Sequence, residues 1–375
     1  MKTNIYFMHE ITYVFKKGRK KNYLNKTIEA KEFYYGLPLF EESRDIQIIE
    51  FEIKKDNDKR VLKKIERAMS KLLSLPFYFS QILTSENFKI LKNSKNIILT
   101  NESVACSLLP YLIYLRIFKK RNILIFAMGL YSKKLNYKIL KSLHYLVIKL
   151  IVYSANKVFF LGKGELNVAR SINKNEDKFI YFPFSIDTEF WHTDNLDLKN
   201  NNNEIIFVGN DSNRSVEILK ELPKFLPNLK FKYITNLRKL LDLEIENVEI
   251  IKGDWGKKYL SDIELLEHYK SSKICIIPVS EGNQPSGQSV ALQAMSLGIP
   301  VVISDTNGFW DRDEFYDNHN ILFVNKNNIQ GWVNKINDLI NNNNLLTTVS
   351  VNAQKTVIER FNLKVFYNKL NDYLE

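Results

Sequence analysis

The sequence predicts an α/β protein with two doubly wound domains, each a parallel sheet covered by helices. Its 375 residues are too many for one ordinary core and suit two. Short apolar runs of strand length alternate with helical patterns along the whole chain. The alternation is interrupted by a polar stretch that ends in Lys199 and the four asparagines Asn200–Asn203, a composition typical of a linker.

The interruption sets the expected domain boundaries. Residues 1–187 are expected to form the N-terminal domain, 188–203 the linker and 204–350 the C-terminal domain. Residues 351–375 are expected to form C-terminal helices that cross back onto the N-terminal domain. Two such domains facing each other would leave a cleft, and ligands of doubly wound sheets bind beyond the carboxyl ends of the strands.

In the first half, the expected strands are short runs rich in Ile, Val and Phe. They are Asn4–Met8, Ile46–Glu52, Asn96–Thr100, Asn122–Met128, Lys157–Leu161 and Phe179–Phe182. Helices are expected between them because apolar residues recur there at helical spacing. The helices are Lys59–Leu75, Val104–Phe118 and Asn136–Tyr153.

The second half repeats the alternation. Its expected strands are Glu204–Val208, Lys230–Ile234, Val248–Ile251, Lys273–Pro278, Pro300–Ser304 and Ile321–Val324. Its expected helices are Ser215–Leu222, Ile263–Lys270, Ser289–Leu297, Trp332–Asn341 and Val351–Phe361. No repeat of fixed period is visible in the sequence, so the two halves are expected to be similar sheets rather than tandem copies.

Composition excludes several classes of protein. With 45% apolar and 26% charged residues, the chain matches a packed globular protein rather than a disordered or fibrous one. Two cysteines cannot form a disulfide framework. The N-terminus has no pattern of a secretion signal, and no uncharged apolar run reaches the roughly 18 residues of a membrane span. We therefore expect a cytoplasmic protein, either soluble or peripheral at the inner face of the membrane.

The formal charge of +12 is concentrated in one stretch. Residues 103–164 contain eleven Lys or Arg residues and no Asp or Glu. Such a surface suits anionic lipids, anionic glycans or nucleic acid, and a merely solvated lysine-rich face is the alternative. Nucleic acid is the least favoured partner because no RNA- or DNA-reading motif accompanies the charge.

The strongest local pattern is Ile276–Val302, with the order strand, polar loop, helix, tight turn and strand. Ser286 is expected to cap the helix, and Gly287 would let a ligand approach the backbone closely, so that helix N–H groups face the loop. That arrangement predicts a phosphate site. Gln293 follows about a turn and a half into the helix, where it is expected to reach a sugar hydroxyl. An ordinary strand-helix-strand unit with a surface loop is the alternative.

This loop and helix resemble the donor-binding region of family 4 retaining glycosyltransferases, the glycosyl transferases group 1, which have the GT-B fold. Most of that family has two glutamates in this region, the second before Ala-Met. Here Pro285 stands at the first position and Gln293 at the second. Glu281 would supply the missing carboxylate from a longer loop, or Ser286 and Gln288 would replace its contacts. The motif Pro-Ser-Gly-Gln-Ser resembles one branch of the family.

Further stretches follow the order of the family over about residues 96–361. They are Ser154–Leu161, Phe182–Trp191, Ile206–Asn210 and Asp305–Phe309. The family holds the donor diphosphate with an Arg and a Lys soon after the first glycine of the C-terminal domain. The resemblance makes Arg214 the expected clamp, since a guanidinium can grip phosphate oxygens bidentately. A solvent-facing arginine at a helix start is the alternative.

The resemblance and the local pattern together predict a set of site residues. The donor-binding residues are Gly209, Asn210, Arg214, Ser286, Gly287, Gln288, Ser289, Gln293, Asn307 and Gly308. Glu281 is the catalytic candidate toward the sugar. Glu102 and His9 are the acceptor-side catalytic candidates because each is expected at the carboxyl end of a strand, although a lone histidine is more often structural.

Two more stretches of the N-terminal half bear on the resemblance. Family members often have a histidine where Met128 stands, so that contact is absent here or is supplied by another residue. The motif Glu32–Gly36 resembles an N-terminal loop of the same branch, with simple aromatic packing as the alternative.

The implied function is transfer of a sugar from a nucleotide-diphosphate donor to a glycan or lipid-linked acceptor, in cell-surface polysaccharide or glycolipid biosynthesis. The resemblance implies retention of anomeric configuration and no metal or other cofactor. Asp311–Asp313 is too weak a motif to indicate a metal site. An epimerase or hydrolase of the same fold and a non-catalytic donor-binding subunit are the alternatives. The basic stretch 103–164 would then face an anionic membrane surface.

Overall fold

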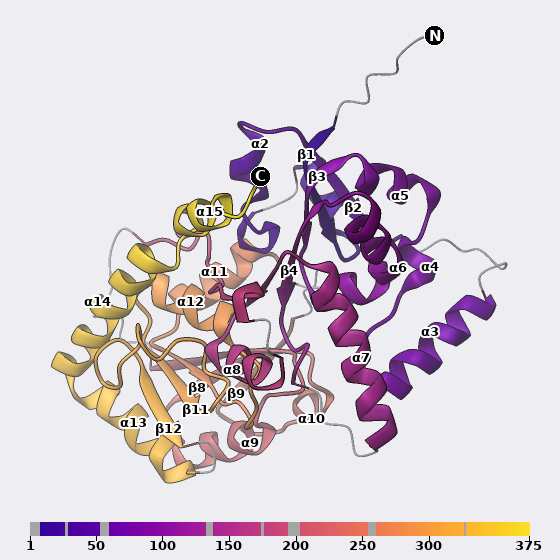
Figure 1. The fold of residues 1–375 in the computed structure, drawn as a ribbon. Coiled ribbons are helices and arrows are strands. Elements are labelled where there is room, and N and C mark those ends of the chain that lie inside the picture. Colours follow the sequence, from indigo (N-terminus) through magenta and orange to yellow (C-terminus); the bar gives the residue numbers. More distant parts are fainter. Residues whose placement is uncertain are drawn as a thin grey trace, which may run out of the picture. The chain divides into compact units, whose positions relative to one another are not determined.

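The computed structural model describes residues 8–26, 29–52, 60–132, 138–173, 176–193, 203–253, 260–325 and 328–375 (Figure 1). The chain divides into two compact units. Unit 1 consists of Met1–Ile28, Phe33–Phe182 and Tyr367–Glu375, and unit 2 of Glu29–Glu32 and Pro183–Phe366. Unit 2 therefore begins a few residues before the expected boundary at residue 187, and it includes a four-residue segment from near the N-terminus. Most of the expected linker 188–203 lies outside the described residues.

Unit 1 is built on a six-stranded parallel sheet with the order β2-β1-β3-β4-β5-β6. The strands are β1 His9–Phe15, β2 Ile46–Glu50, β3 Ser94–Leu99, β4 Asn122–Ala127, β5 Lys157–Phe160 and β6 Phe179–Tyr181. Every residue of β4 is buried, so both faces of the sheet are covered there, as in most parallel sheets.

The helices of unit 1 lie between these strands in the sequence. They are α1 Arg19–Leu24, α2 Leu37–Glu41, α3 Arg60–Leu73, α4 Phe79–Ile82, α5 Ser85–Lys92, α6 Glu102–Phe118, α7 Lys138–Ser154 and α8 Lys163–Ile172. Asn101 caps α6, since its side chain accepts hydrogen bonds from the N–H groups of Ser103 and Val104, at 3.0 and 3.1 Å.

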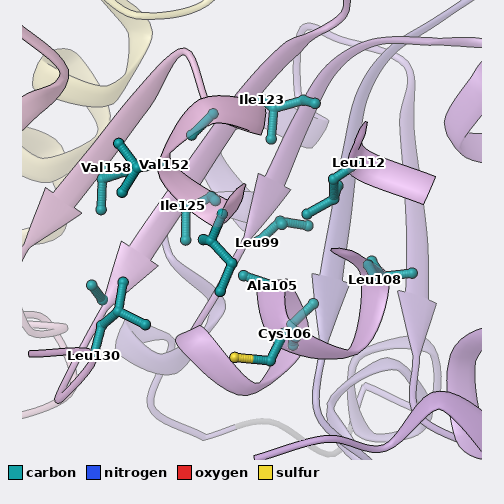
Figure 2. Close-up of a cluster of buried hydrophobic side chains, with 14 of the residues drawn as sticks. Leu99, Ala105, Cys106, Leu108, Leu112, Ile123, Ile125, Leu130, Val152 and Val158 are labelled. Atoms are coloured by element: carbon teal, nitrogen blue, oxygen red, sulfur yellow. The ribbon is translucent and has the colours of Figure 1, made fainter. Parts of the chain in front are cut away.

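Figure 2 shows part of the core of unit 1. Leu99, Ile123 and Ile125 from the strands are buried with Leu108 and Leu112 of α6. Burying each of these side chains contributes about 1.5–3 kcal/mol relative to exposure. The core thus fixes the start of α6 against the carboxyl end of β3.

Unit 2 has a second six-stranded parallel sheet, with the order β12-β11-β10-β7-β8-β9. The strands are β7 Glu204–Val208, β8 Lys230–Thr235, β9 Val248–Lys252, β10 Ile274–Ile277, β11 Val301–Asp305 and β12 Leu322–Asn325. The chain builds outward from β7 to β9 and then returns to the other side of β7 to add β10, β11 and β12. The strand order therefore reverses between β7 and β10, and ligands of open α/β sheets bind beyond the carboxyl ends at such a point.

The helices of unit 2 complete its layers. They are α9 Val216–Phe225, α10 Arg238–Leu241, α11 Asp262–Lys270, α12 Gln288–Ser296, α13 Ile329–Asn341 and α14 Asn343–Arg360. Residues of β7, β10 and β11 share a core with α9 and α13, and Trp332 of α13 is fully buried in it. Both cysteines, Cys106 and Cys275, are buried free thiols.

The last helix, α15 Leu363–Asn371, begins in unit 2 and ends in unit 1. Within unit 1, the ring of Tyr367 packs on Phe40 with centroids 4.4 Å apart. Lys369 donates from Nζ to the carbonyl oxygen of Tyr181 at 2.8 Å. These contacts fasten the C-terminal residues to the sheet of unit 1.

The observed strands agree with the expected ones within a few residues, except at the N-terminus. The expected strand Asn4–Met8 lies outside the described residues apart from Met8, and the first strand of the structure is β1 His9–Phe15. Its buried run Ile11–Phe15 pairs with β2 and β3. The short helices α1, α2, α4, α5, α8 and α10 were not expected. In the described part of the chain, no helix combines the length and apolar character that a membrane span requires.

Candidate functional site

The candidate site lies where the strand order of unit 2 reverses. After β7 the chain turns at Gly209 and then runs alongside the residues that follow β10. The N–H of Ser215 donates to the carbonyl oxygen of Pro278 at 2.9 Å, and the N–H of Ser280 donates to that of Asn213 at 2.7 Å. These two bonds hold residues 213–215 beside the loop that leads into α12.

Arg214 is buried at this point, with 3% of its side chain exposed. Its guanidinium lies between two glycines: a Cβ on Gly209 would meet Nε at 2.4 Å, and one on Gly287 would meet Nη1 at 3.2 Å. Nη2 pairs with Asp211 at 3.1 Å, whereas Nε and Nη1 have no hydrogen-bond partner among the described residues. Burying a cation with unpaired donors is costly, so this arrangement indicates a site for an anion.

Gly287 places the start of α12 beside this guanidinium. Its φ of +83° is in the left-handed region that favours glycine, and it is the N-cap residue of a nine-residue helix that no side chain caps. The expectation that Ser286 caps the helix is therefore wrong, because the Ser286 hydroxyl instead accepts a hydrogen bond from Nδ2 of Asn213 at 2.9 Å. A helix N-terminus next to an arginine is a favourable place for a phosphate group.

The loops after β10 and β11 pack backbone against backbone. Oε1 of Glu281 accepts a hydrogen bond from the N–H of Asn307 at 3.1 Å. A Cβ on Gly308 would lie 2.4 Å from the carbonyl oxygen of Gln284 and 2.7 Å from that of Gly282. The structure thus brings together Glu281, Asn307 and Gly308, as the sequence predicted, and their contact with a donor stays a prediction.

Asn210 ties three turns of unit 2 together. Its Nδ2 donates to the carbonyl oxygen of Gly253 at 2.6 Å, and its Oδ1 accepts from the N–H of Asn236 at 2.5 Å. These residues follow β7, β9 and β8, respectively. Asn210 therefore shapes the carboxyl edge of the sheet, and a direct contact with a ligand stays a prediction.

The polar residues of α12 itself are more enclosed than the sequence suggested. Gln288 and Gln293 are buried and Ser289 is half-buried. Nε2 of Gln293 donates to Oε1 of Glu32 at 2.9 Å. Gln293 was expected to be open to a sugar hydroxyl, but it is hydrogen-bonded to Glu32, which was not among the expected site residues.

The position expected for His9 is wrong. His9 is the first residue of β1 and lies at the amino end of the sheet of unit 1, where its Nδ1 is 2.8 Å from Oδ2 of Asp45. The difference follows from the expected strand Asn4–Met8, which would have placed His9 just beyond its carboxyl end. A residue at the amino end of a parallel strand lies on the edge of the sheet away from the ligand-binding edge.

Glu102 lies where it was expected, just beyond the carboxyl end of β3. Its Oε2 accepts a hydrogen bond from the N–H of Met128 at 3.3 Å. Since β3 adjoins β1 at the point where the strand order of unit 1 reverses, Glu102 lies at the ligand-binding edge of this sheet.

A second carboxyl group of unit 1, missed in the sequence, supports the same loop. Oε1 of Glu165 accepts hydrogen bonds from the N–H groups of Gly129 and Tyr131 at 3.1 and 2.9 Å. Burial raises the pKa of Glu165 to about 7 despite these bonds, and the charge of Glu102 adds to the rise. The signal that could have found it is its place in the first turn of a helix directly after β5.

A metal centre is not visible in the described residues, where no three His, Cys, Asp or Glu side chains group together closely enough to hold an ion. Independence from metal stays a prediction.

Solved structures with the same architecture identify the fold. Sucrose-phosphate synthase from Thermosynechococcus elongatus matches with a TM-score of 0.70 at 13% identity, over 97% of this chain and 98% of that one. HepE of Anabaena in complex with UDP-glucose matches with a TM-score of 0.66 at 12% identity, over 97% and 99%. A putative UDP-N-acetylglucosamine 2-epimerase from Listeria monocytogenes matches with a TM-score of 0.54 at 12% identity, over 97% and 95%. The fold is therefore the GT-B fold.

A family model matches part of the sequence of unit 2. Residues 192–356 match the model of glycosyl transferases group 1. They include Arg214 and the whole loop Glu281–Gln293, so the resemblance noted in the sequence is confirmed over these residues. No curated protein sequence matches the chain.

Proposed function

We propose that the protein is a glycosyltransferase that moves a sugar from a nucleoside-diphosphate donor to a glycan or lipid-linked acceptor. The observation that carries the proposal is the buried guanidinium of Arg214, which has two unpaired N–H donors among the described residues and lies against the N-cap glycine of α12. The family match of residues 192–356 and the GT-B fold support the same activity.

In this proposal, Arg214 and the N-terminus of α12 hold the donor diphosphate. When the bond between the anomeric carbon and the phosphate oxygen breaks, the diphosphate takes the electron pair and gains negative charge. A fixed cation and a helix N-terminus stabilise that charge without reorganising during the reaction. The acceptor oxygen bonds to the anomeric carbon, and its proton passes to the leaving phosphate. Retention of configuration and independence from metal belong to this proposal.

Glu281 is the proposed contact to the transferred sugar. Its Oε1 accepts a hydrogen bond from the N–H of Asn307, which orients the carboxylate. On the acceptor side, Glu102 stays a candidate at the ligand-binding edge of unit 1, whereas His9 is no longer one.

An anionic membrane is the proposed partner of α7 and α3, which pack against each other through a hydrogen bond from the His144 ring to the carbonyl oxygen of Leu73 at 2.6 Å. Both helices expose large apolar side chains among basic ones. On α7 the exposed residues include Lys138, Ile139, Lys141, Leu143, Leu146 and Lys149. Apolar side chains beside lysines favour binding to anionic lipid, and a lipid-linked acceptor would be found there. The inner face of the membrane is the location that belongs to this proposal.

Product analysis tests the proposed activity. The protein is incubated with nucleotide sugars and a membrane extract that contains lipid-linked glycans. We expect release of a nucleoside diphosphate together with a new glycosidic product. Release of free sugar alone would indicate a hydrolase. Formation of an epimerised nucleotide sugar would indicate an epimerase, and one of the matched structures is that of a putative epimerase. Binding of the donor without any turnover would indicate a non-catalytic subunit.

A further inference from the structure

A segment from near the N-terminus belongs to unit 2. In Glu29–Glu32, each of the first three residues makes a hydrogen bond within this unit. Oε2 of Glu29 accepts from the N–H of Ile263 at 3.0 Å, and the N–H of Ala30 donates to Asp262 at 3.3 Å. The N–H of Lys31 donates to Asp187 at 3.2 Å. The segment is thus held in place immediately before Glu32.

Glu32 ends this segment in the interior of unit 2, where 2% of the residue is exposed. Its Oε1 accepts hydrogen bonds from Nε1 of Trp191 and Nε2 of Gln293, each at 2.9 Å. Its Oε2 is buried and has no hydrogen-bond partner among the described residues. Burying a carboxyl oxygen without a hydrogen-bond donor costs folding free energy, so this oxygen is a candidate to bind a ligand.

The carboxyl group neighbours the proposed diphosphate site. Gln293 lies six residues after Gly287 on α12, which corresponds to about 9 Å along the helix axis. Tyr269, whose hydroxyl donates to Oε1 of Gln293 at 3.4 Å, connects the two sites. Burial raises its pKa most, and the charges of Arg214 and Glu32 both act on it, in opposite directions. Arg214 and Glu32 therefore both lie near enough to this buried hydroxyl for their charges to act on it.

The distance from the proposed diphosphate site indicates which part of a nucleotide this carboxyl group would bind. In a nucleoside diphosphate, the ribose follows the phosphates, and its two adjacent hydroxyls are hydrogen-bond donors. A carboxylate oxygen that accepts a bond from a hydroxyl forms a charge-assisted hydrogen bond, which is stronger than one to a neutral amide. The side chain of Gln293 cannot supply that charge, but it can orient a carboxylate that does.

We propose that Glu32 recognises the donor ribose, accepting a hydrogen bond from a ribose hydroxyl through Oε2 while Gln293 and Trp191 hold Oε1. This inference rests on the proposed function, because it deepens the same donor site. It also accounts for the missing glutamate of α12: the carboxylate is contributed by another part of the chain and is paired with the glutamine that stands in its place.

The test compares ribo and deoxyribo nucleotides. The nucleoside diphosphate that binds the wild type most tightly is chosen from a panel, and its 2′-deoxy and 3′-deoxy forms are titrated alongside it by calorimetry. We expect one deoxy form to bind wild type about 10- to 100-fold more weakly, the range for one hydrogen bond to a charged group. Glu32→Gln should weaken binding of the ribo form by a similar factor and nearly abolish the discrimination.

Two further variants separate recognition from structural support. The exchange Glu32→Gln with Gln293→Glu keeps one carboxyl and one amide in contact, and it should recover much of the lost discrimination. Glu29→Gln in the same segment should leave discrimination unchanged. If the ratio of the affinities for the ribo and deoxy forms were the same in Glu32→Gln as in wild type, the inference would be wrong. If wild type bound no nucleoside diphosphate, the proposed function would fail, and the inference with it.

Discussion

At the scale of single residues, the structure gives two carboxyl groups unusual surroundings, one in each unit. Burial raises the pKa of both Glu32 and Glu165 to about 7. The sequence offered little warning of this, because a glutamate is normally exposed. Their burial depends on residues far away in the chain, such as Gln293 for Glu32 and Gly129 for Glu165. The family resemblance pointed to Arg214, which follows Gly209 closely in the sequence, but local patterns pointed to neither carboxyl group.

Glu165 should make stability depend on pH. Its pKa in the folded protein exceeds its ordinary value, so between about pH 4.5 and pH 7 the folded state binds more protons than the unfolded state. The stability that the neutral carboxyl allows is fully present below that window and is lost as pH rises through about 7. We expect the melting temperature of Glu165→Gln to fall less than that of wild type over this range. The exposed Glu42→Gln serves as control; an identical pH profile for wild type and Glu165→Gln would contradict this assignment.

At the scale of elements, alternation of strands and helices predicted both sheets almost completely. The continuous apolar runs of β4 and β10 are typical of strands buried on both faces. The prediction failed at β1, where Thr12 interrupts the apolar run and the short apolar stretch before it was chosen instead. In the structure, His9 lies at the amino end of β1, whereas the expected strand put it beyond a carboxyl end. Short helices such as α2 and α4 were also missed, since one or two turns leave too little periodicity to recognise.

The start of α12 offers a prediction at this scale. Gly287→Ala places a Cβ at a φ of +83° and 2.5 Å from Cγ2 of Ile277. We expect the variant to be destabilised by about 1–2 kcal/mol from the backbone conformation alone, with a further cost from the contact. Displacement of the helix start should also weaken binding of a nucleoside diphosphate.

Gly282→Ala in the same loop is the matched control, because a Cβ there meets no heavy atom within 4 Å. Its melting temperature and nucleotide affinity should match those of wild type. If both alanine variants behaved alike in thermal melts and calorimetry, the close approach of the backbone at Gly287 would not matter for the site.

At the scale of the whole molecule, the fold class was predictable, because length and alternation permit few other architectures. The residues that make up each unit were less predictable. A crossing of the C-terminal residues back to the first domain was expected, but no local signal assigns Glu29–Glu32 to unit 2. This assignment rests on contacts between residues distant in sequence. The family resemblance supplied the site where patterns alone left a phosphate loop and an ordinary surface loop both open.

Membrane binding is also a property of the whole molecule. Vesicles that contain anionic lipid should sediment the protein at low salt, and recruitment should decline as salt screens the lysines. The double variant Ile139→Ser with Leu146→Ser removes two exposed apolar side chains of α7 and should weaken recruitment without loss of stability. Equal binding to neutral and anionic vesicles, or none to either, would contradict the proposed partner.

The central claim is that the guanidinium of Arg214 binds the donor diphosphate, and calorimetric titration of Arg214→Met tests it most directly. Methionine keeps an unbranched buried side chain but removes the charge and the unpaired donors, so the melting temperature should not fall. We expect affinity for a nucleoside diphosphate such as UDP to drop about 10- to 100-fold, and affinity for the nucleoside alone to stay as in wild type. Unchanged diphosphate affinity in a folded Arg214→Met protein would contradict the account.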